Sequence, residues 1–92
     1  MYSCNFTNRL KKDYKVAVKR GYNMNKFEKV YDLLEKNGEL PATYKPHPLK
    51  GNWIGFMDAH IEPNWILIYR VNKNLKTIDF VRMGTHSDLF KK

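Results

Sequence analysis

The sequence predicts an α+β domain, in which one N-terminal strand and two helices precede an antiparallel three-stranded meander. Two observations support this. Apolar residues recur at helical spacing in two stretches of the first half, whereas residues 53–83 contain three strand-like runs separated by short turns. Such short turns make consecutive strands antiparallel neighbours. We find no repeats and no linker, so residues 1–92 are expected to form a single domain.

The first half is predicted to contain a short strand at residues 2–7 and helices at residues 8–20 and 25–37, packed as an antiparallel helical hairpin. Gly21 ends the first helix. Asn25, with Glu28 three residues later, has the spacing of a capping box at the start of the second. The apolar stripes of the two helices are Leu10, Tyr14, Ala17 and Val18, and then Phe27, Val30, Tyr31 and Leu34.

The second half begins with a predicted loop at residues 40–52, which holds three of the four prolines. Strands are predicted at residues 53–61, 65–71 and 75–83, with turns at residues 62–64 and 72–74. Residues 84–92 are expected to form a tail.

A net charge of +8 and a pI near 9.7 favour an anionic partner such as nucleic acid. No apolar run is long enough to span a membrane, and the N-terminus is too polar for a secretory signal, so we expect a cytoplasmic protein. Cys4 is the only cysteine, which excludes a disulfide within the chain. A basic helix face is expected to attract phosphates, although such faces are commonly only solvated: Arg9, Lys12, Lys15 and Lys19.

All three histidines lie in the second half: His47, His60 and His86. Each alone is more commonly a surface or sheet-edge residue, but together they suggest acid–base chemistry near neutral pH. Prolines on both sides restrict the backbone of His47. Arg82 replaces an apolar residue at the end of the last strand, so it needs a partner. Asp58 is the structural candidate, and a substrate phosphate is the functional one.

Cleavage of RNA without a metal requires a base, an acid and a cation that stabilises the phosphorane. The histidines and Arg82 supply these groups, although the sequence does not say which histidine is the acid. A three-histidine zinc site is the alternative, but a strongly basic chain suits a dication poorly, so we expect no metal and no cofactor. Trp65 and Phe90 are candidates for stacking on bases, and Trp65 is equally suited to the core.

Three blocks of sequence, residues 47–53, 58–69 and 82–90, resemble the YafQ branch of the RelE superfamily of bacterial toxins. The resemblance implies a RelE-like fold and an mRNA interferase that cleaves translated message in the ribosomal A site, leaving a 2′,3′-cyclic phosphate. It implies that His47, His60, His86 and Arg82 are catalytic. The residues that it assigns to substrate binding are Trp65, Phe90, Lys50 and Asn64.

The same resemblance implies an acidic antitoxin partner with a DNA-binding N-terminal part, which links the toxin indirectly to operator DNA. The sequence departs from the family at Asn64, where aspartate is common, and at Met57, where arginine is often found. Glu62 and Asp88 are candidates to replace the missing carboxylate. These departures leave open a second function: a weakly active or inactive toxin homologue that mainly binds its antitoxin and helps to repress the operon.

Overall fold

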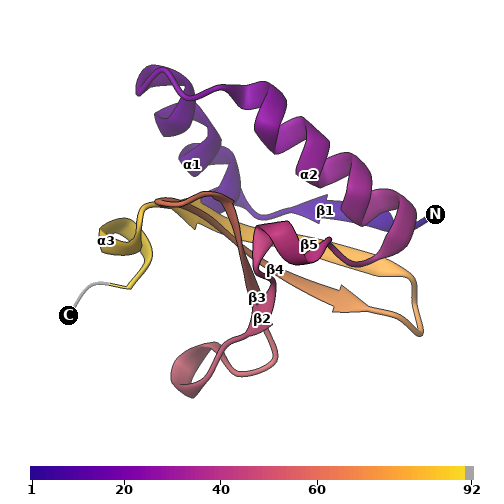
Figure 1. Cartoon of the computed structure of the whole chain (residues 1–92). Coiled ribbons are helices and arrows are strands. Elements are labelled where there is room, and N and C mark those ends of the chain that lie inside the picture. The colour runs from indigo at the N-terminus through magenta and orange to yellow at the C-terminus, as the bar shows by residue number, and fades with distance from the viewer. Residues whose placement is uncertain (91–92) are drawn as a thin grey trace.

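The structure is a computed structural model that describes residues 1–90, and it confirms the α+β fold class. Helices α1 and α2 lie together on one side of a five-stranded sheet, while the short helix α3 lies at one end of it (Figure 1). The elements in chain order are β1 (Ser3–Phe6), α1 (Asn8–Lys19), α2 (Met24–Asn37), the 3₁₀ helix η1 (Ala42–Tyr44), β2 (His47–Pro48), the 3₁₀ helix η2 (Gly51–Trp53), β3 (Met57–Glu62), β4 (Trp65–Asn72), β5 (Thr77–Gly84) and α3 (His86–Leu89).

The strand order is β1-β5-β4-β3-β2. Strands β3, β4 and β5 form the predicted antiparallel meander. The strand predicted at residues 2–7 is confirmed as β1, but its parallel pairing with β5 was not predicted. Strand β2, which adds a two-residue antiparallel strand to β3, was not predicted either. The sheet therefore joins the first strand of the chain to the last.

Two predicted strands begin later than expected. Strand β3 begins at Met57 rather than residue 53, because η2 occupies residues 51–53 and Gly55 has a positive φ of 92°. Strand β5 begins at Thr77 rather than residue 75, because Lys76 has a φ of 53° that closes the turn. The expected tail contains α3 from residue 86, and its last two residues lie outside the described part of the chain.

The helix ends follow ordinary capping chemistry. Thr7 caps α1, and its Oγ1 accepts a hydrogen bond of 3.0 Å from the Leu10 amide. Asn23 caps α2 by accepting from the Asn25 amide at 3.1 Å, so the capping box predicted at Asn25 is wrong. Gly38 ends α2 in the left-handed conformation, with a φ of 71°.

The main core lies between the two long helices and the sheet. Its fully buried members include Leu10, Val30, Leu34, Trp65, Leu67, Tyr69, Ile78 and Phe80. A smaller apolar cluster, built on Ile66, Ile68 and Leu89, covers part of the opposite face. In α1 the buried positions are Leu10, Asp13 and Ala17, whereas Val18 is 52% exposed. Across residues 1–90, no helix combines the length and the apolar character that crossing a bilayer requires.

Candidate active site

The sheet places the predicted site on the face away from α1 and α2. Residues paired across neighbouring strands point to the same face. His60 pairs with Ile66, and Asp58 pairs with Ile68; both isoleucines belong to the smaller cluster on that face. The histidines come from three elements: His47 from β2, His60 from β3 and His86 from the first residue of α3.

Asp58 connects His47 to the sheet. His47 pairs with Asp58 in the register of β2 and β3, and its Nε2 lies 3.0 Å from Asp58 Oδ1. Burial raises the pKa of the Asp58 carboxyl, and charges on His47, His60 and His86 oppose that rise. The Nδ1 of His47 lies 3.1 Å from the Lys45 carbonyl oxygen. Both ring nitrogens therefore lie within hydrogen-bonding distance of an oxygen atom.

His60 and His86 face one another at the end of the sheet. Their ring centroids are 5.7 Å apart and the rings are nearly perpendicular, with an interplanar angle of 63°. The ring of Phe90, at the end of α3, lies 6.4 Å from that of His86. Phe90 also packs against the smaller cluster, which anchors the end of α3 to the sheet. The structure thus brings the three histidines and Phe90 into one neighbourhood.

Asn64 holds His86 in one orientation. Its Oδ1 accepts a hydrogen bond of 3.2 Å from the His86 backbone amide and lies 3.0 Å from His86 Nδ1. Because the backbone amide is always a donor, the facing atom must be the amide oxygen, and Nδ1 must carry the proton. The neutral ring therefore keeps its lone pair on Nε2. Asn64 thus fixes the tautomer of His86 without adding the negative charge of an aspartate.

Arg82 is engaged by a carboxylate that the sequence reasoning missed. Its Nε and Nη2 donate to the two oxygens of Asp13 at 3.1 and 3.2 Å, and Asp13 Oδ2 also accepts from the Met83 amide. The predicted pairing of Arg82 with Asp58 is wrong, because β1 stops pairing at Phe80 and α1 then lies against the free edge of β5. The spacing of Asp13 along α1 could have predicted this contact, since Asp13 falls on the buried stripe of the helix.

Trp65 does not present a ring to solvent. Its side chain is 2% exposed and packs against Tyr22, with ring centroids 4.9 Å apart. The placement of Trp65 in the core is confirmed, and its contact with a base stays a prediction. Lys50 is exposed at the start of η2, in the segment that connects β2 to β3.

The two carboxylates considered as replacements at Asn64 are used elsewhere. Glu62 accepts from Lys26 Nζ at 2.7 Å, on the helix side of the molecule. Asp88 pairs with Arg20 at 2.8 Å and forms a capping box with Thr85. The Arg20 guanidinium and the Thr85 amide hold the pKa of Asp88 well below its usual range. Asp88 therefore positions α3, and with it His86, from behind the site.

The remaining predicted features lie outside this site. The basic side chains Arg9, Lys12, Lys15 and Lys19 are all exposed on α1. Met57 is partly buried against the main core, so this position of β3 carries no charge. Within residues 1–90, no three His, Cys, Asp or Glu side chains are grouped as metal ligands.

Comparison with known proteins gives a consistent picture. A family model described as "Bacterial toxin of type II toxin-antitoxin system, YafQ" matches residues 2–91. The mRNA interferase toxin YafQ of Escherichia coli K12 is 48% identical over 86 residues, which cover 92% of this chain and 91% of that protein.

Two solved structures extend the comparison to the fold. A crystal structure of YafQ from E. coli BL21(DE3) has a TM-score of 0.90 at 43% identity, covering 98% of this chain and 99% of that one. YafQ in the E. coli DinJ–YafQ complex has a TM-score of 0.88 at 44% identity, with the same coverage. These values confirm the resemblance found in the sequence.

Proposed function

Because the chain belongs to the YafQ family of bacterial type II toxins, we propose that it is an mRNA interferase, an endoribonuclease that arrests translation and growth. The observation that carries the proposal is the pair of facing rings, His60 and His86, with His86 held by Asn64. The solved DinJ–YafQ complex supports a cognate antitoxin as its partner. Its site of action is the cytoplasm, on message held in the ribosomal A site.

His86 is the group that exchanges a proton at the scissile phosphate. Its Nε2 is free in the fixed tautomer, while the contact between Nδ1 and Asn64 persists in both protonation states. His60 lies beside it on the same face and supplies the second proton-transfer group. His47, facing Asp58 and the Lys45 carbonyl, serves as a positive charge near the reacting phosphate.

Arg82 completes the site as the cation that stabilises the phosphorane. Its contacts with Asp13 use Nε and Nη2, so we assign the contact with the phosphate to Nη1, the remaining nitrogen of the guanidinium. Phe90 stacks on a base next to the scissile bond, and Lys50 contacts a phosphate farther along the message. The 2′-oxygen attacks the phosphorus and the 5′-oxygen leaves, which gives a 2′,3′-cyclic phosphate and a 5′-OH.

The proposal is tested by replacing His86 with alanine. We expect cleavage of message on programmed ribosomes to fall by about 10²–10⁴-fold, the usual contribution of one proton-transfer group. The exposed neighbour Ser87→Ala is the matched control and should retain cleavage. Product ends and 5′-end positions are identified with and without ribosomes, and with and without a chelator. Unchanged cleavage by folded His86→Ala would contradict the assignment, and dependence on a metal would favour the zinc alternative.

Asn64→Asp separates the interferase from a protein that only binds its antitoxin. An aspartate near His86 Nδ1 stabilises the imidazolium, so the alkaline limb of the pH–rate profile should move to higher pH. If neither the parent nor Asn64→Asp cleaves message, while both bind the antitoxin and its operator DNA, the repressor function is the correct one.

A further inference from the structure

A groove opens beside His60, at the edge of the sheet between η1 and β3. It encloses about 450 Å³ and is lined by residues 43–45, at the end of η1, and by residues 60–63, at the end of β3 and in the turn after it. This volume is within the range of pockets that accept ligands, roughly 300–1,000 Å³. Apart from His60, no residue of this lining has a role in the proposed mechanism as a side chain.

The strand pairing explains why this edge is open. Strand β2 pairs only with Met57 and Asp58, so within residues 1–90 no strand covers β3 beyond Asp58 on that side. The 3₁₀ helix η1 lies against β3 there instead. A helix does not continue the hydrogen-bonded ladder of a sheet, and space remains between the two elements. The groove is therefore formed by the fold itself, beside one of the two facing histidines.

Tyr44 provides an aromatic ring in this groove. It is partly buried and packs against the main core, which restrains the ring where it borders the groove. A restrained ring loses little conformational entropy when a ligand stacks on it. Aromatic side chains commonly stack on the bases of single-stranded RNA, because every base has a flat π face. Tyr44 therefore suits a nucleobase that lies next to His60.

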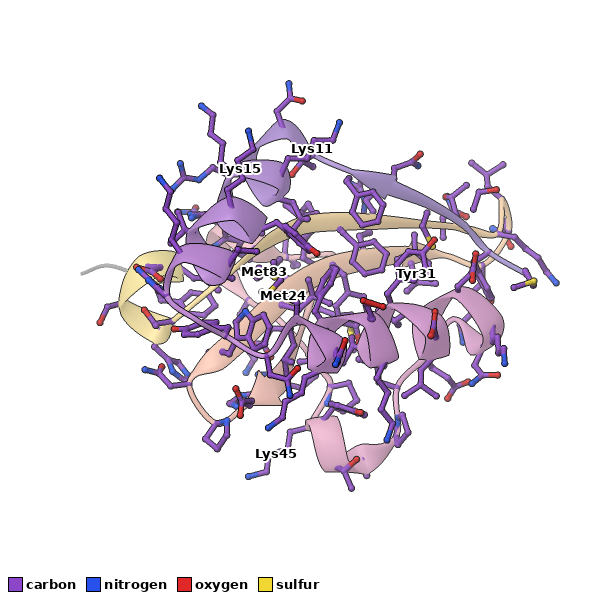
Figure 2. All side chains as sticks on the ribbon, turned by 90° about the horizontal axis from the view of Figure 1, so that it is seen from above. Lys11, Lys15, Met24, Tyr31, Lys45 and Met83 are labelled. Atoms are coloured by element: carbon purple, nitrogen blue, oxygen red, sulfur yellow. The ribbon has the colours of Figure 1, made fainter. Side chains whose placement is uncertain are left out.

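Lys45 supplies a positive charge at the groove. Its backbone is left-handed, with a φ of 50°, which is uncommon for a residue that has a Cβ. Its carbonyl oxygen lies 3.1 Å from His47 Nδ1, while its side chain extends outward from the fold (Figure 2). One residue thus contacts His47 through its backbone and offers an ammonium group to a phosphate at the groove.

Glu62 gives the groove a hydrogen-bond acceptor. It is the only acidic residue among those that line the groove in the described chain. Lys26 of α2 donates to its Oε2 at 2.7 Å, which restrains the carboxylate and offsets its repulsion of a phosphate. We assign the contact with the ligand to Oε1. A carboxylate only accepts hydrogen bonds, so it favours a ligand that presents an N–H group.

We propose that this groove binds the nucleotide next to the scissile phosphate and selects a base with an exocyclic amino group. The base stacks on Tyr44, its amino group donates to Glu62, and its phosphate contacts Lys45. Adenine and cytosine carry an amino group where hypoxanthine and uracil present a carbonyl oxygen, which a carboxylate repels. The inference rests on the proposed function, because it places the message of that interferase.

The groove and Phe90 flank the two facing histidine rings. Phe90 adjoins His86, and the groove adjoins His60. Message that lies across both rings therefore places one neighbouring nucleotide at Phe90 and the other in the groove. A peptide strand added to the edge of β3 is the alternative occupant. It suits the groove less well, because strand pairing uses backbone groups and gives no role to the charged and aromatic side chains.

The test uses full-chain variants with matched controls. Glu62→Gln removes the carboxylate from the groove, and Lys26→Gln breaks the same ion pair but keeps the carboxylate. Lys45→Asn removes the charge and introduces a residue that tolerates the left-handed backbone. Lys76→Asn makes the same change at a φ of 53° in the turn before β5, far along the chain from the groove.

Each variant is tested on ribosomes programmed with messages whose A-site codon contains only adenosine, inosine, cytidine or uridine. Adenosine and inosine differ by an amino group replaced with an oxygen, and so do cytidine and uridine. Cleavage is measured as kcat/KM. Affinity is measured separately with 2′-deoxy codons, which lack the hydroxyl that attacks the phosphorus, so binding is observed without reaction.

We expect the parent and Lys26→Gln to favour adenosine over inosine, and cytidine over uridine, by about tenfold in both cleavage and affinity. Glu62→Gln should reduce both preferences to less than about threefold, because an amide also donates to a carbonyl oxygen. Lys45→Asn should weaken affinity for all four codons alike, by about threefold to tenfold, and Lys76→Asn by less than about twofold.

A parent chain without either preference would overturn the proposal, as would preferences that persist in Glu62→Gln. Lost antitoxin affinity in Glu62→Gln and Lys45→Asn, with both preferences unchanged, would also overturn it and assign the groove to a peptide strand. Preferences in affinity for the 2′-deoxy codons, without cleavage of any ribonucleotide codon, would support the groove as a nucleotide site and contradict the proposed function.

Discussion

Replacing Asp13 with alanine tests whether the pair between α1 and β5 holds the structure together. Asp13 is 8% exposed, and its carboxylate makes two hydrogen bonds with Arg82 and one with the Met83 amide. Removing one partner of a buried ion pair costs about 3–5 kcal/mol, because the other charge is left without compensation. The Met83 amide also loses its acceptor at the free edge of β5.

The expected loss is somewhat smaller than that range, about 2–4 kcal/mol in the free energy of unfolding. Arg82 is 18% exposed, and a pocket of about 260 Å³ beside it gives water access to the guanidinium. Asp13→Asn should cost less, because the amide oxygen still accepts from the Met83 amide. Urea unfolding at pH 7, followed by circular dichroism, measures both values.

Asp79→Ala is the matched control. Asp79 also pairs with an arginine, Arg70, at 2.9 Å, but the two side chains are 28% and 53% exposed. Pairs of this kind contribute about 0–1 kcal/mol. If Asp13→Ala costs no more than Asp79→Ala, the buried pair is not a principal link between α1 and the sheet, and the reasoning from its burial is refuted.

Two further predictions concern α3. Gly84→Ala should lower the free energy of unfolding by about 1–3 kcal/mol and should also lower message cleavage. A Cβ at Gly84 would lie 2.9 Å from Asp88 Cβ and would displace the helix that carries His86. Urea unfolding and cleavage assays measure the two effects, and unchanged cleavage would show that α3 tolerates the shift. Arg20 holds the pKa of Asp88 below its usual range, so the stabilisation from Asp88 is present above the unfolded pKa of about 3.9 and is lost as the pH falls below that value. The difference in free energy of unfolding between the parent and Asp88→Asn should therefore shrink from pH 7 to pH 3. A constant difference would contradict the assigned cause.

The sequence predicted the helices and strands that depend on patterns of neighbouring residues. The apolar spacing of α1 and α2 and the short turns of the meander were sufficient to place them. The parallel pairing of β1 with β5 was not predictable in this way, because it joins residues more than 70 positions apart. Strand β2 was hidden among prolines, which commonly indicate a loop.

For the candidate site, sequence reasoning found the residue types but not their partners. His47, His60 and His86 are brought together by register and by α3, neither of which local periodicity reveals. Asp13 was not considered as a partner of Arg82, although its spacing from Leu10 and Ala17 placed it on the buried side of the helix. Trp65 followed the apolar parity of β4, and that pattern correctly predicted the core.

The parallel pairing of β1 with β5 also determines how much of the chain must be synthesised before the sheet is complete. At about 5–20 residues per second, 92 residues take roughly 5–18 s to translate, and residues 77–80 follow β1 by more than 70 positions. Until then β1 has no partner, β4 lacks one neighbour, and His86 has not been added. Strands β1 and β5 can therefore pair only after residue 80 has been added. A shorter growing chain lacks both this pairing and His86, so it lacks two parts of the proposed site.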